Sequence, residues 1–375
     1  MRRHSPGIIR DAIVGYLSHA PAASASEIHN AVAGQLGHVS ASSVRSYLSL
    51  NCPGQFQRLE RGRYSLAEPI HGPIQPVVFP EHVIGKGKLI NADSFAWLKQ
   101  VEPSSIHAVV TDPPYGLVEY TDAEKSKLRA GKGGVWRVPP SFDGHRRAPL
   151  PRFTVLNEGD KEALEDFFHE LGCLLLRATV PGANVIVAAN PLLAHTVATA
   201  MSASGLELRG QITRLVMTMR GGDRPKNAHA EFPDVSVMPR SMFEPWVVLR
   251  HPLEGRVQDN LRKWKTGGFL RPSEDRPFGD VIRSSPTSSA ERQLAAHPSL
   301  KPQAFMRQIV RAVLPMKEGV VLDPFAGSGS TIAAANAVGY HSIGIEKDLE
   351  FYKLAKNAIP KLEKLSLREI DPVLA

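Results

Sequence analysis

The stretch from residue 319 to residue 348, GVVLDPFAGSGSTIAAANAVGYHSIGIEKD, constrains the fold more than any other part of the chain. An apolar run that ends at Asp323 predicts a buried strand, and the closely spaced Gly327 and Gly329 predict a tight loop after it. A helix of small residues follows, and a second apolar strand reaches Glu346. A strand, a glycine loop, a helix and a strand in this order form a β–α–β unit, which is typical of a parallel sheet.

The same alternation of strands and helices extends over most of the chain from about residue 87 onward. We predict strands at residues 89–90, 106–110, 184–189, 212–219, 246–249, 319–322 and 341–345, and helices at residues 94–100, 160–179, 303–314, 330–338 and 348–359. This pattern predicts the α/β class, with a Rossmann-like, doubly wound and mostly parallel sheet that carries helices on both faces.

Residues 1–68 form a separate pattern, with three short amphipathic helices followed by a basic hairpin. Three helices and a hairpin resemble a winged helix-turn-helix, which binds DNA through its third helix and its wing. In that interpretation the DNA-binding residues are Ser43, Arg45, Arg61 and Arg63. The alternative is a module that binds protein or only packs on the main domain. Residues 69–86 are rich in proline and are predicted to be a semi-rigid linker.

Composition narrows the classes of function. The 45 basic residues exceed the 37 acidic ones and give a formal net charge of +8, which favours a polyanion such as nucleic acid as the partner. Two cysteines, Cys52 and Cys173, are too few for a disulfide framework, and the histidines show no metal-ligand spacing. We find neither a membrane span nor a signal peptide, and we therefore expect a cytoplasmic, nucleoid-associated protein with no metal and no membrane partner.

The glycine loop predicts a particular kind of cofactor. Glycines let the backbone approach a ligand closely, and Glu346 follows at a spacing that suits a carboxylate bonded to two ribose hydroxyls. A phosphate-binding loop needs a lysine before its Ser or Thr, but Gly329 is followed directly by Ser330 and Thr331. The third glycine of a dinucleotide fingerprint is also missing. A nucleoside cofactor without phosphate, S-adenosylmethionine, fits these residues best.

A second motif lies at the end of the strand predicted at residues 106–110, where the chain reads TDPPYG. Proline cannot donate to a sheet ladder, so the chain leaves the sheet at Asp112, Pro113, Pro114 and Tyr115. A carboxylate, a backbone carbonyl and an aromatic ring are therefore expected side by side at a strand end.

Together, DPPY at 112–115 and DPFAGSGS at 323–330 resemble the DNA methyltransferases that methylate exocyclic amines, adenine N6 or cytosine N4. HPSLKP at 297–302 resembles the HPTQKP element of that family, with Ser299 and Leu300 in place of Thr and Gln. Asn91-Ala92-Asp93 resembles the Gly-Asp element that opens the family domain. DPPY comes first and the glycine loop comes near the end, which resembles the permuted β group of the family.

The resemblance implies a role for each motif. Asp112, Pro113, Pro114 and Tyr115 would form the catalytic set, in which Asp112 and the Pro113 carbonyl accept the two hydrogens of the amine and Tyr115 stacks on a base flipped out of double-stranded DNA. The cofactor-binding set would hold S-adenosylmethionine; it comprises Asp93, His297, Lys301, Asp323, Phe325, Ala326, Gly327, Ser328, Gly329 and Glu346.

The resemblance covers residues 87–365, which form the predicted methyltransferase domain and leave residues 366–375 as a C-terminal tail. Within that domain, residues 119–152 are predicted to be a basic mobile loop and the irregular residues 220–296 a target-recognition region. A basic tract with an interleaved aromatic lies in the second region and is predicted to contact DNA; its residues are Arg262, Lys263, Trp264 and Lys265.

These motifs predict a site-specific adenine-N6 DNA methyltransferase, since related cytosine-N4 enzymes more often carry Ser in place of Asp112. Cytosine N4 stays open, as do methylation of RNA or protein and a DNA-binding regulator that has lost catalysis. Cytosine-C5 chemistry is excluded, because it needs a cysteine after a proline and Cys52 instead precedes Pro53. The resemblance leaves a homodimer and a cognate restriction endonuclease open as partners.

Overall fold

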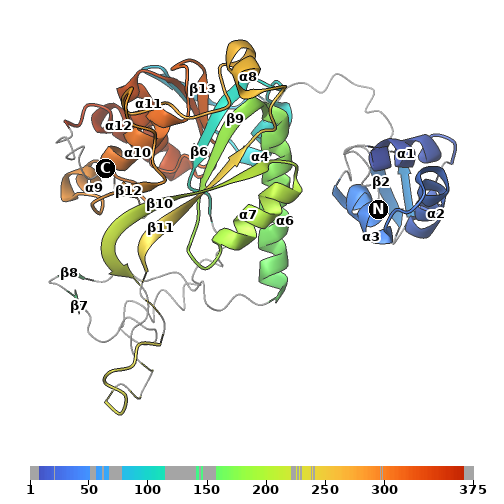
Figure 1. Ribbon diagram of the computed structural model, residues 1–375, viewed down its shortest axis with the longest axis horizontal. Helices are drawn as coiled ribbons and strands as arrows, with labels where there is room; N and C mark the ends of the chain where they lie inside the picture. The colour runs from blue at the N-terminus through green and yellow to red at the C-terminus, as the bar shows by residue number, and fades with distance from the viewer. Residues whose placement is uncertain are drawn as a thin grey trace. The chain divides into compact units, whose positions relative to one another are not determined.

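The computed structural model describes residues 8–20, 22–50, 56–60, 63–66, 78–114, 141–142, 145–146, 158–220, 225, 228, 230–237, 239, 241–295, 297 and 299–366. The chain divides into two compact units, residues 1–77 and residues 78–375 (Figure 1). Each unit has its own hydrophobic core and is described by itself.

The first unit combines three helices with a small sheet. Its helices are α1 (Ile8–Leu17), α2 (Ala25–Leu36) and α3 (Ala41–Leu50), and its strands β1 (Ala23–Ser24), β2 (Phe56–Glu60) and β3 (Arg63–Leu66) pair in the order β1-β3-β2. The side chain of Ser24 caps α2 in a capping box with Glu27, as its position before an apolar helix predicts. Ser40 accepts a hydrogen bond from the Ser43 amide at the start of α3. The element types agree with the predicted three helices and hairpin, and the winged-helix assignment stays a prediction.

The second unit is built on one sheet of nine strands in the order β12-β10-β11-β9-β6-β13-β14-β5-β4. The strands are β4 (Glu81–Ile84), β5 (Gly87–Asn91), β6 (Ile106–Thr111), β9 (Thr179–Ala188), β10 (Glu207–Arg220), β11 (Ser241–Arg250), β12 (Val281–Arg283), β13 (Val320–Asp323) and β14 (His341–Glu346). Five neighbours, β9, β6, β13, β14 and β5, run parallel. The outer β4 and β11 are antiparallel to the strands beside them. The described residues also include a two-stranded pair, β7 (Ser141–Phe142) and β8 (His145–Arg146).

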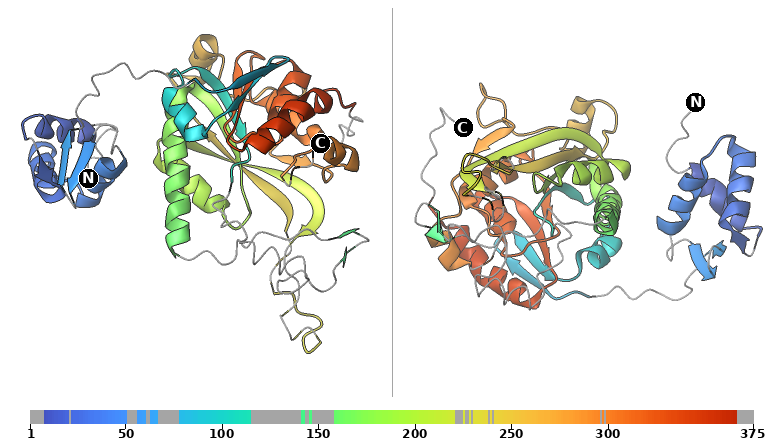
Figure 2. Two further views of the ribbon diagram at one scale, coloured as in Figure 1. Left: turned by 180° about the vertical axis from the view of Figure 1, so that it is seen from behind. Right: turned by 90° about the horizontal axis from the view of Figure 1, so that it is seen from below.

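Helices cover both faces of this sheet (Figures 1 and 2). One face packs against α4 (Ser94–Gln100), α6 (Glu158–Ala178) and α7 (Ala194–Ala203). The other packs against α10 (Gln303–Ala312), α11 (Ser330–Val338) and α12 (Leu349–Leu362). Two shorter helices, α8 (Val257–Trp264) and α9 (Ser289–Leu294), complete the unit. The α/β class with a mostly parallel, doubly covered sheet is as predicted from the alternation of strands and helices.

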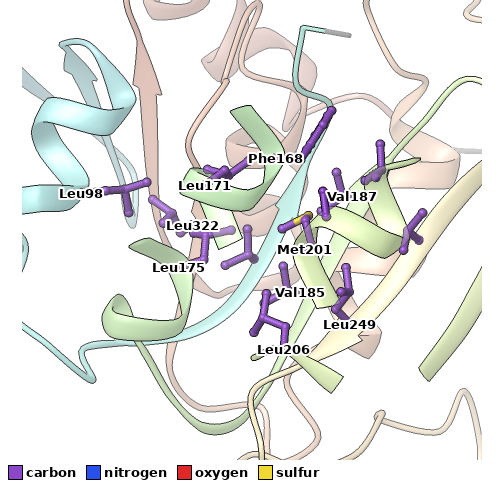
Figure 3. Close-up of a cluster of buried hydrophobic side chains, with 14 of the residues drawn as sticks. Leu98, Phe168, Leu171, Leu175, Val185, Val187, Met201, Leu206, Leu249 and Leu322 are labelled. Carbon is purple, nitrogen blue, oxygen red and sulfur yellow. The ribbon is translucent and has the colours of Figure 1, made fainter. Parts of the chain in front are cut away.

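The core follows the two-residue period of the strands. In β9, Val185 and Val187 face the α6 side, and Ile186 and Ala188 face the α10 side. Figure 3 shows the first of these layers, in which Phe168, Leu171 and Leu175 of α6 meet Leu98, Met201 and Leu322. All six of those side chains are fully buried. This packing fixes α6 against β6 and β9 and so holds the strand end that carries Asp112.

Two predicted boundaries are wrong. The linker was expected to reach residue 86, but β4 (Glu81–Ile84) pairs with β5 and belongs to the sheet, and the second unit begins at Val78. Charged and proline-rich flanks masked this short edge strand. The segment from 220 to 296 is irregular in the prediction apart from the strand at 246–249, which corresponds to β11, but it also contains α8, β12 and α9. Most of the predicted basic loop 119–152 and all of residues 367–375 lie outside the described residues.

In the part of the chain that the structure describes, no helix has the length and apolar character that crossing a bilayer requires. Those residues also contain no cluster of His, Cys, Asp or Glu that could hold a metal ion.

Candidate active site

The topology creates a crevice between β6 and β13. These two strands are parallel neighbours, but the helix that follows β6 in the described chain, α6, covers one face of the sheet, and the helix that follows β13, α11, covers the other. The two connections therefore diverge at the carboxyl ends of the strands. Ligands of open α/β sheets bind at such a switch point. Asp112 and the glycine loop are the residues that flank it.

Asp323 ties the two sides of this crevice together. Its Oδ1 accepts a hydrogen bond from the Thr111 hydroxyl at 2.7 Å, across from β6, and another from the Phe325 amide at 3.1 Å. Thr331, at the start of α11, also bonds to the carboxylate. Burial raises the pKa of Asp323 from 3.8 to about 6, although its hydrogen bonds with Thr331, Thr111 and the Phe325 amide lower it. The carboxyl group fixes the loop relative to the strand that ends in Asp112.

The two loop glycines are required because side chains of His297 and Ile359 pack directly against their backbone. Gly327 has a φ of +51°, and a Cβ there would come within 3.0 Å of the His297 ring. Gly329 has a φ of +83° and begins α11, and a Cβ there would come within 2.4 Å of Ile359 in α12. The Gly327 amide donates to Glu346 Oε2 at 2.8 Å, and the Asp348 amide donates to Oε1 at 2.7 Å. Glu346 therefore braces the glycine loop from the end of β14.

His297 covers this loop from the other side. Its ring packs edge-on against Phe351 of α12, with 4.4 Å between the ring centroids, and its Nδ1 accepts a hydrogen bond from the Ser299 amide. Burial lowers the pKa of His297, while the charge of Asp112 opposes that shift. The neutral ring is thus favoured near pH 7, and the histidine acts as a wall of the site.

Lys301 joins the catalytic motif to the far strands of the sheet. Its ammonium lies 2.7 Å from Asp112 Oδ2 and 3.0 Å from Glu244 Oε1 in β11. Burial lowers the pKa of Lys301, but Asp112 and Glu244 more than offset this, and the net shift is upward. Glu244 Oε2 in turn accepts from Arg214 of β10 at 2.8 Å. Sequence reasoning missed Glu244 and Arg214; the available signal was a charged residue inside an apolar strand, which needs a buried partner.

A cavity opens between these groups. Its lining includes Asp112, the loop from Asp323 to Ser328, the ring of His297 and the ammonium-bearing Lys301. Five further lining residues were not predicted as site residues; they are Trp246, Ser299, Met306, Ser330 and Thr331. The indole Nε1 of Trp246 and the hydroxyl of Ser330 are buried and have no hydrogen-bond partner among the described residues. Buried polar atoms normally find partners, so a polar ligand that supplies them fits this cavity.

The donor set of the cavity fits S-adenosylmethionine. The glycine loop offers backbone amides and close approach, and the half-buried Phe325 lines the cavity. Lys301, the one basic side chain with a permanent charge in the lining, is already paired with two carboxylates, so the cavity offers no cation for a phosphate. A nucleoside that carries a sulfonium rather than phosphates matches these groups.

Three residues of the predicted cofactor-binding set do not line the cavity in the described structure. Asp93 caps α4 by accepting from the Phe95 and Ala96 amides, and pairs with Lys347 at 3.0 Å. Glu346 braces the glycine loop without lining the cavity, and Gly329 lies buried at the start of α11. Tyr115 falls outside the described residues, while Pro113 is buried and Pro114 is exposed beside Asp112.

The basic tract of α8 lies beside the amino end of β9, whereas the candidate site lies at the carboxyl ends of the parallel strands. Asn260 of α8 donates to the Pro181 carbonyl near the start of β9, whereas Asp112 follows the end of β6, which is parallel to β9 (Figure 1). Lys263 and Trp264 both bond to Glu254, at 2.5 and 2.7 Å. The structure therefore does not bring this predicted DNA-binding tract to the candidate site. Of the predicted residues in the first unit, Arg45 and Arg63 are exposed, Ser43 is half-buried, and Arg61 lies outside the described residues.

Comparison with known proteins shows a similarity of the site to one family. The model of the N6/N4 methyltransferase family, described as DNA methylase, matches residues 245–357. That segment contains Trp246, His297, Lys301 and the whole glycine loop. The prediction of a DNA methyltransferase that uses S-adenosylmethionine is confirmed at this level.

Relatives of the chain cover more of its length. The type II methyltransferase M.HindIII of Haemophilus influenzae is 26% identical over 298 residues, which span 72% of this chain and 94% of that protein. The type II methyltransferase M2.DpnII of Streptococcus pneumoniae is 23% identical over 72% of this chain and 88% of its own length.

Solved structures of DNA methylases also resemble the chain. TTHA0409 of Thermus thermophilus, described as a putative DNA modification methylase and solved with S-adenosylmethionine, aligns with a TM-score of 0.45 and 21% identity over 73% of this chain and 95% of its own. The cytosine-N4-specific PvuII methyltransferase aligns with a TM-score of 0.45 and 15% identity, over 75% of this chain and 86% of its own.

The raised pKa of Asp323 predicts a particular pH dependence of stability. Between pH 4 and pH 6 the folded protein binds more protons at this carboxyl than the unfolded chain does, so its contribution to the free energy of unfolding falls as pH rises. Relative to the variant Asp323→Asn, the wild type should lose about 2 kcal/mol over this interval and stay constant above about pH 7.

The measurement is denaturant unfolding of both proteins from pH 4 to pH 8, followed by tryptophan fluorescence. All tryptophans lie beyond residue 77, so the signal reports the second unit; they are Trp97, Trp136, Trp246 and Trp264. Asp275→Asn, at an exposed position, is the matched control for the chemical change. Stability curves that stay parallel for the wild type and Asp323→Asn would contradict the assigned ionisation.

Proposed function

We propose that this DNA methyltransferase methylates the exocyclic N6 of adenine, at a specific site in double-stranded DNA, with the target base flipped out of the helix. The observation that carries the proposal is the position of Asp112. It lies at the strand end of DPPY, lines the cavity, and sits across the crevice from the glycine loop. Adenine is proposed over cytosine because Asp, rather than Ser, precedes the two prolines.

The chemistry follows from the acceptors at this strand end. An exocyclic amine conjugated to a base is a poor nucleophile, because its lone pair is delocalised into the ring. The Asp112 carboxylate and the Pro113 carbonyl can each accept one N–H of the amine, which draws the nitrogen toward tetrahedral geometry and localises the lone pair. Two successive prolines fix the backbone, so both acceptors are in place before the base enters.

S-adenosylmethionine, when bound, supplies a sulfonium methyl group: the amine lone pair forms the new N–C bond while the electrons of the C–S bond return to sulfur. The amine is cationic after this transfer and becomes acidic, so it loses a proton to Asp112 or to water. Asp112 therefore need not be a strong base. Its main contribution is to position the amine, which is a large part of catalysis between two bound reactants.

A catalytically silent DNA-binding regulator is the alternative of another class. The complete set of Asp112, Pro113, glycine loop and cavity favours the enzyme. Nucleoside analysis of treated DNA also separates adenine N6 from cytosine N4. A homodimer and a partner restriction endonuclease stay predictions, since neither bears on the geometry of one chain.

Replacing the proposed acceptor tests the site directly. Asp112→Ala should lower methyl transfer at least a hundredfold, because the amine loses an acceptor, while S-adenosylmethionine binding stays within about threefold of the wild type. Asp259→Ala is the matched control, since that carboxylate lies in α8, beside the amino ends of the strands and away from the site, and is half-exposed. Radiolabelled methyl transfer to DNA and calorimetric titration of the cofactor give the two quantities. Substantial transfer by Asp112→Ala would exclude the assignment.

We also propose that the first unit binds DNA through α3 and the β2–β3 hairpin. Deleting residues 1–77 should weaken binding and flatten the dependence of log K on log salt, because Lys and Arg contacts to phosphates release counterions. The paired change Arg45→Ala and Arg63→Ala, at exposed positions, should lower the salt slope by about two. Fluorescence anisotropy at several salt concentrations measures both slopes. A slope that is the same with and without residues 1–77 would refute this role.

A further inference from the structure

A row of four buried charges links the proposed catalytic carboxylate to the outer part of the sheet. Asp112, Lys301, Glu244 and Arg214 alternate in sign, and the contacts between successive members measure 2.7, 3.0 and 2.8 Å. Their side chains are between 4% and 15% exposed. Asp112 directly follows β6, Lys301 lies in the segment before α10, and Glu244 and Arg214 lie in β11 and β10, so the row joins four parts of the fold.

The far end of this row is fixed. Arg214 donates from Nε to the Ser284 hydroxyl at 3.0 Å and from a terminal nitrogen to the Ser285 carbonyl at 3.3 Å. Its guanidinium also lies over the Phe305 ring, 5.1 Å from the centroid. Glu244 is held by this anchored arginine through Oε2, which leaves Oε1 directed at Lys301. A buried pair anchored in this way holds Glu244 in one place.

The contact between Lys301 and Asp112, at the other end of the row, affects how the target amine can bind. Lys301 Nζ lies on Asp112 Oδ2, and a nitrogen donor 2.7 Å from that carboxylate is what the proposed mechanism requires of the target amine. Lys301 thus takes the place of the substrate nitrogen in the cavity. The amine can use this oxygen only when Lys301 gives it up. A lysine has three donors and a flexible stem, so it can shift while it keeps a second carboxylate partner.

We propose that Glu244 is a positioning residue for methyl transfer, which retains Lys301 when the target amine displaces that lysine from Asp112. The inference rests on the proposed function, because it takes Asp112 as the acceptor of the amine. Two charge effects follow. In the resting protein Lys301 keeps the buried Asp112 compensated, and during transfer Glu244 offsets the lysine beside a nitrogen that becomes cationic.

Removing the negative charge of Glu244 should therefore bind Lys301 more firmly to Asp112. Glu244→Gln should lower the single-turnover rate constant at pH 7.5 about tenfold or more, with the dissociation constant of S-adenosylmethionine unchanged within twofold. The charged groups that face Lys301 are Asp112 and Glu244, with His297 on its own segment; Asp323 lies beyond Asp112, and Arg214 lies beyond Glu244. Without Glu244, Lys301 loses one of the two carboxylates that raise its pKa.

Two readouts separate positioning from a structural role. The rate of Glu244→Gln should rise with pH more than that of the wild type, because the variant lacks one of the two carboxylates that raise the pKa of Lys301, and a deprotonated Lys301 releases Asp112. The double variant Glu244→Gln with Lys301→Met should be faster than Glu244→Gln alone, because it lacks the lysine that blocks the carboxylate. Glu244→Asp, which keeps the charge on a shorter side chain, should retain most of the rate.

The experiment uses the full chain in excess over a methylatable duplex, at saturating S-adenosylmethionine, with melting curves for every variant. A Glu244→Gln rate equal to that of the wild type, or a double variant no faster than Glu244→Gln alone, would overturn the inference. If Glu244→Gln does not fold, the rate of Glu244→Asp decides: retention of most of the wild-type rate supports the inference, and a hundredfold loss in the folded variant overturns it. Absence of methylation by the wild type would instead refute the proposed function, and cofactor titration of the same sample distinguishes that case.

Discussion

The buried carboxyl group of Asp323 is the contact on which the rest of the site depends. It accepts hydrogen bonds from the Thr111 hydroxyl of β6, the Phe325 amide of the glycine loop and the Thr331 side chain of α11. Those three partners belong to the two strand ends that diverge at the switch point and to the helix behind them. One side chain thereby sets the distance between the acceptor end at Asp112 and the cavity wall at the glycine loop. Its raised pKa is the electrostatic consequence of placing that contact in the interior.

A second constraint is the close packing around that loop. His297 lies over Gly327, and Ile359 lies against Gly329, so α12 and the segment before α10 approach the backbone more closely than any side chain would allow. Glu346, at the end of β14, accepts a hydrogen bond from the Gly327 amide. The loop is therefore shaped before a ligand enters, and little conformational freedom remains to be lost on binding.

Short sequence patterns predicted the features that depend on neighbouring residues alone, such as where a helix begins and ends. The bounds of α4 and α11 follow from the residues that begin and end them, and Ser24 caps α2 because a hydroxyl before an apolar helix satisfies its free amides. Short sequence patterns do not indicate which residues from distant segments come into contact. Nothing in the spacing of Arg214, Glu244 and Lys301 indicates that three segments bring them into one row. Periodicity also cannot say at which end of the sheet a helix lies, which is why the tract around Trp264 was expected beside the site.

The measurement that tests the account most directly is the identity of the methylated base. Purified protein is incubated with S-adenosylmethionine and unmethylated genomic DNA, and the DNA is then digested to nucleosides for mass spectrometry. We expect N6-methyladenine, formed by the wild type and not by Asp112→Ala. N4-methylcytosine would contradict the adenine assignment and leave the acceptor geometry standing. A protein that binds the cofactor but produces neither base would contradict the catalytic role given to Asp112.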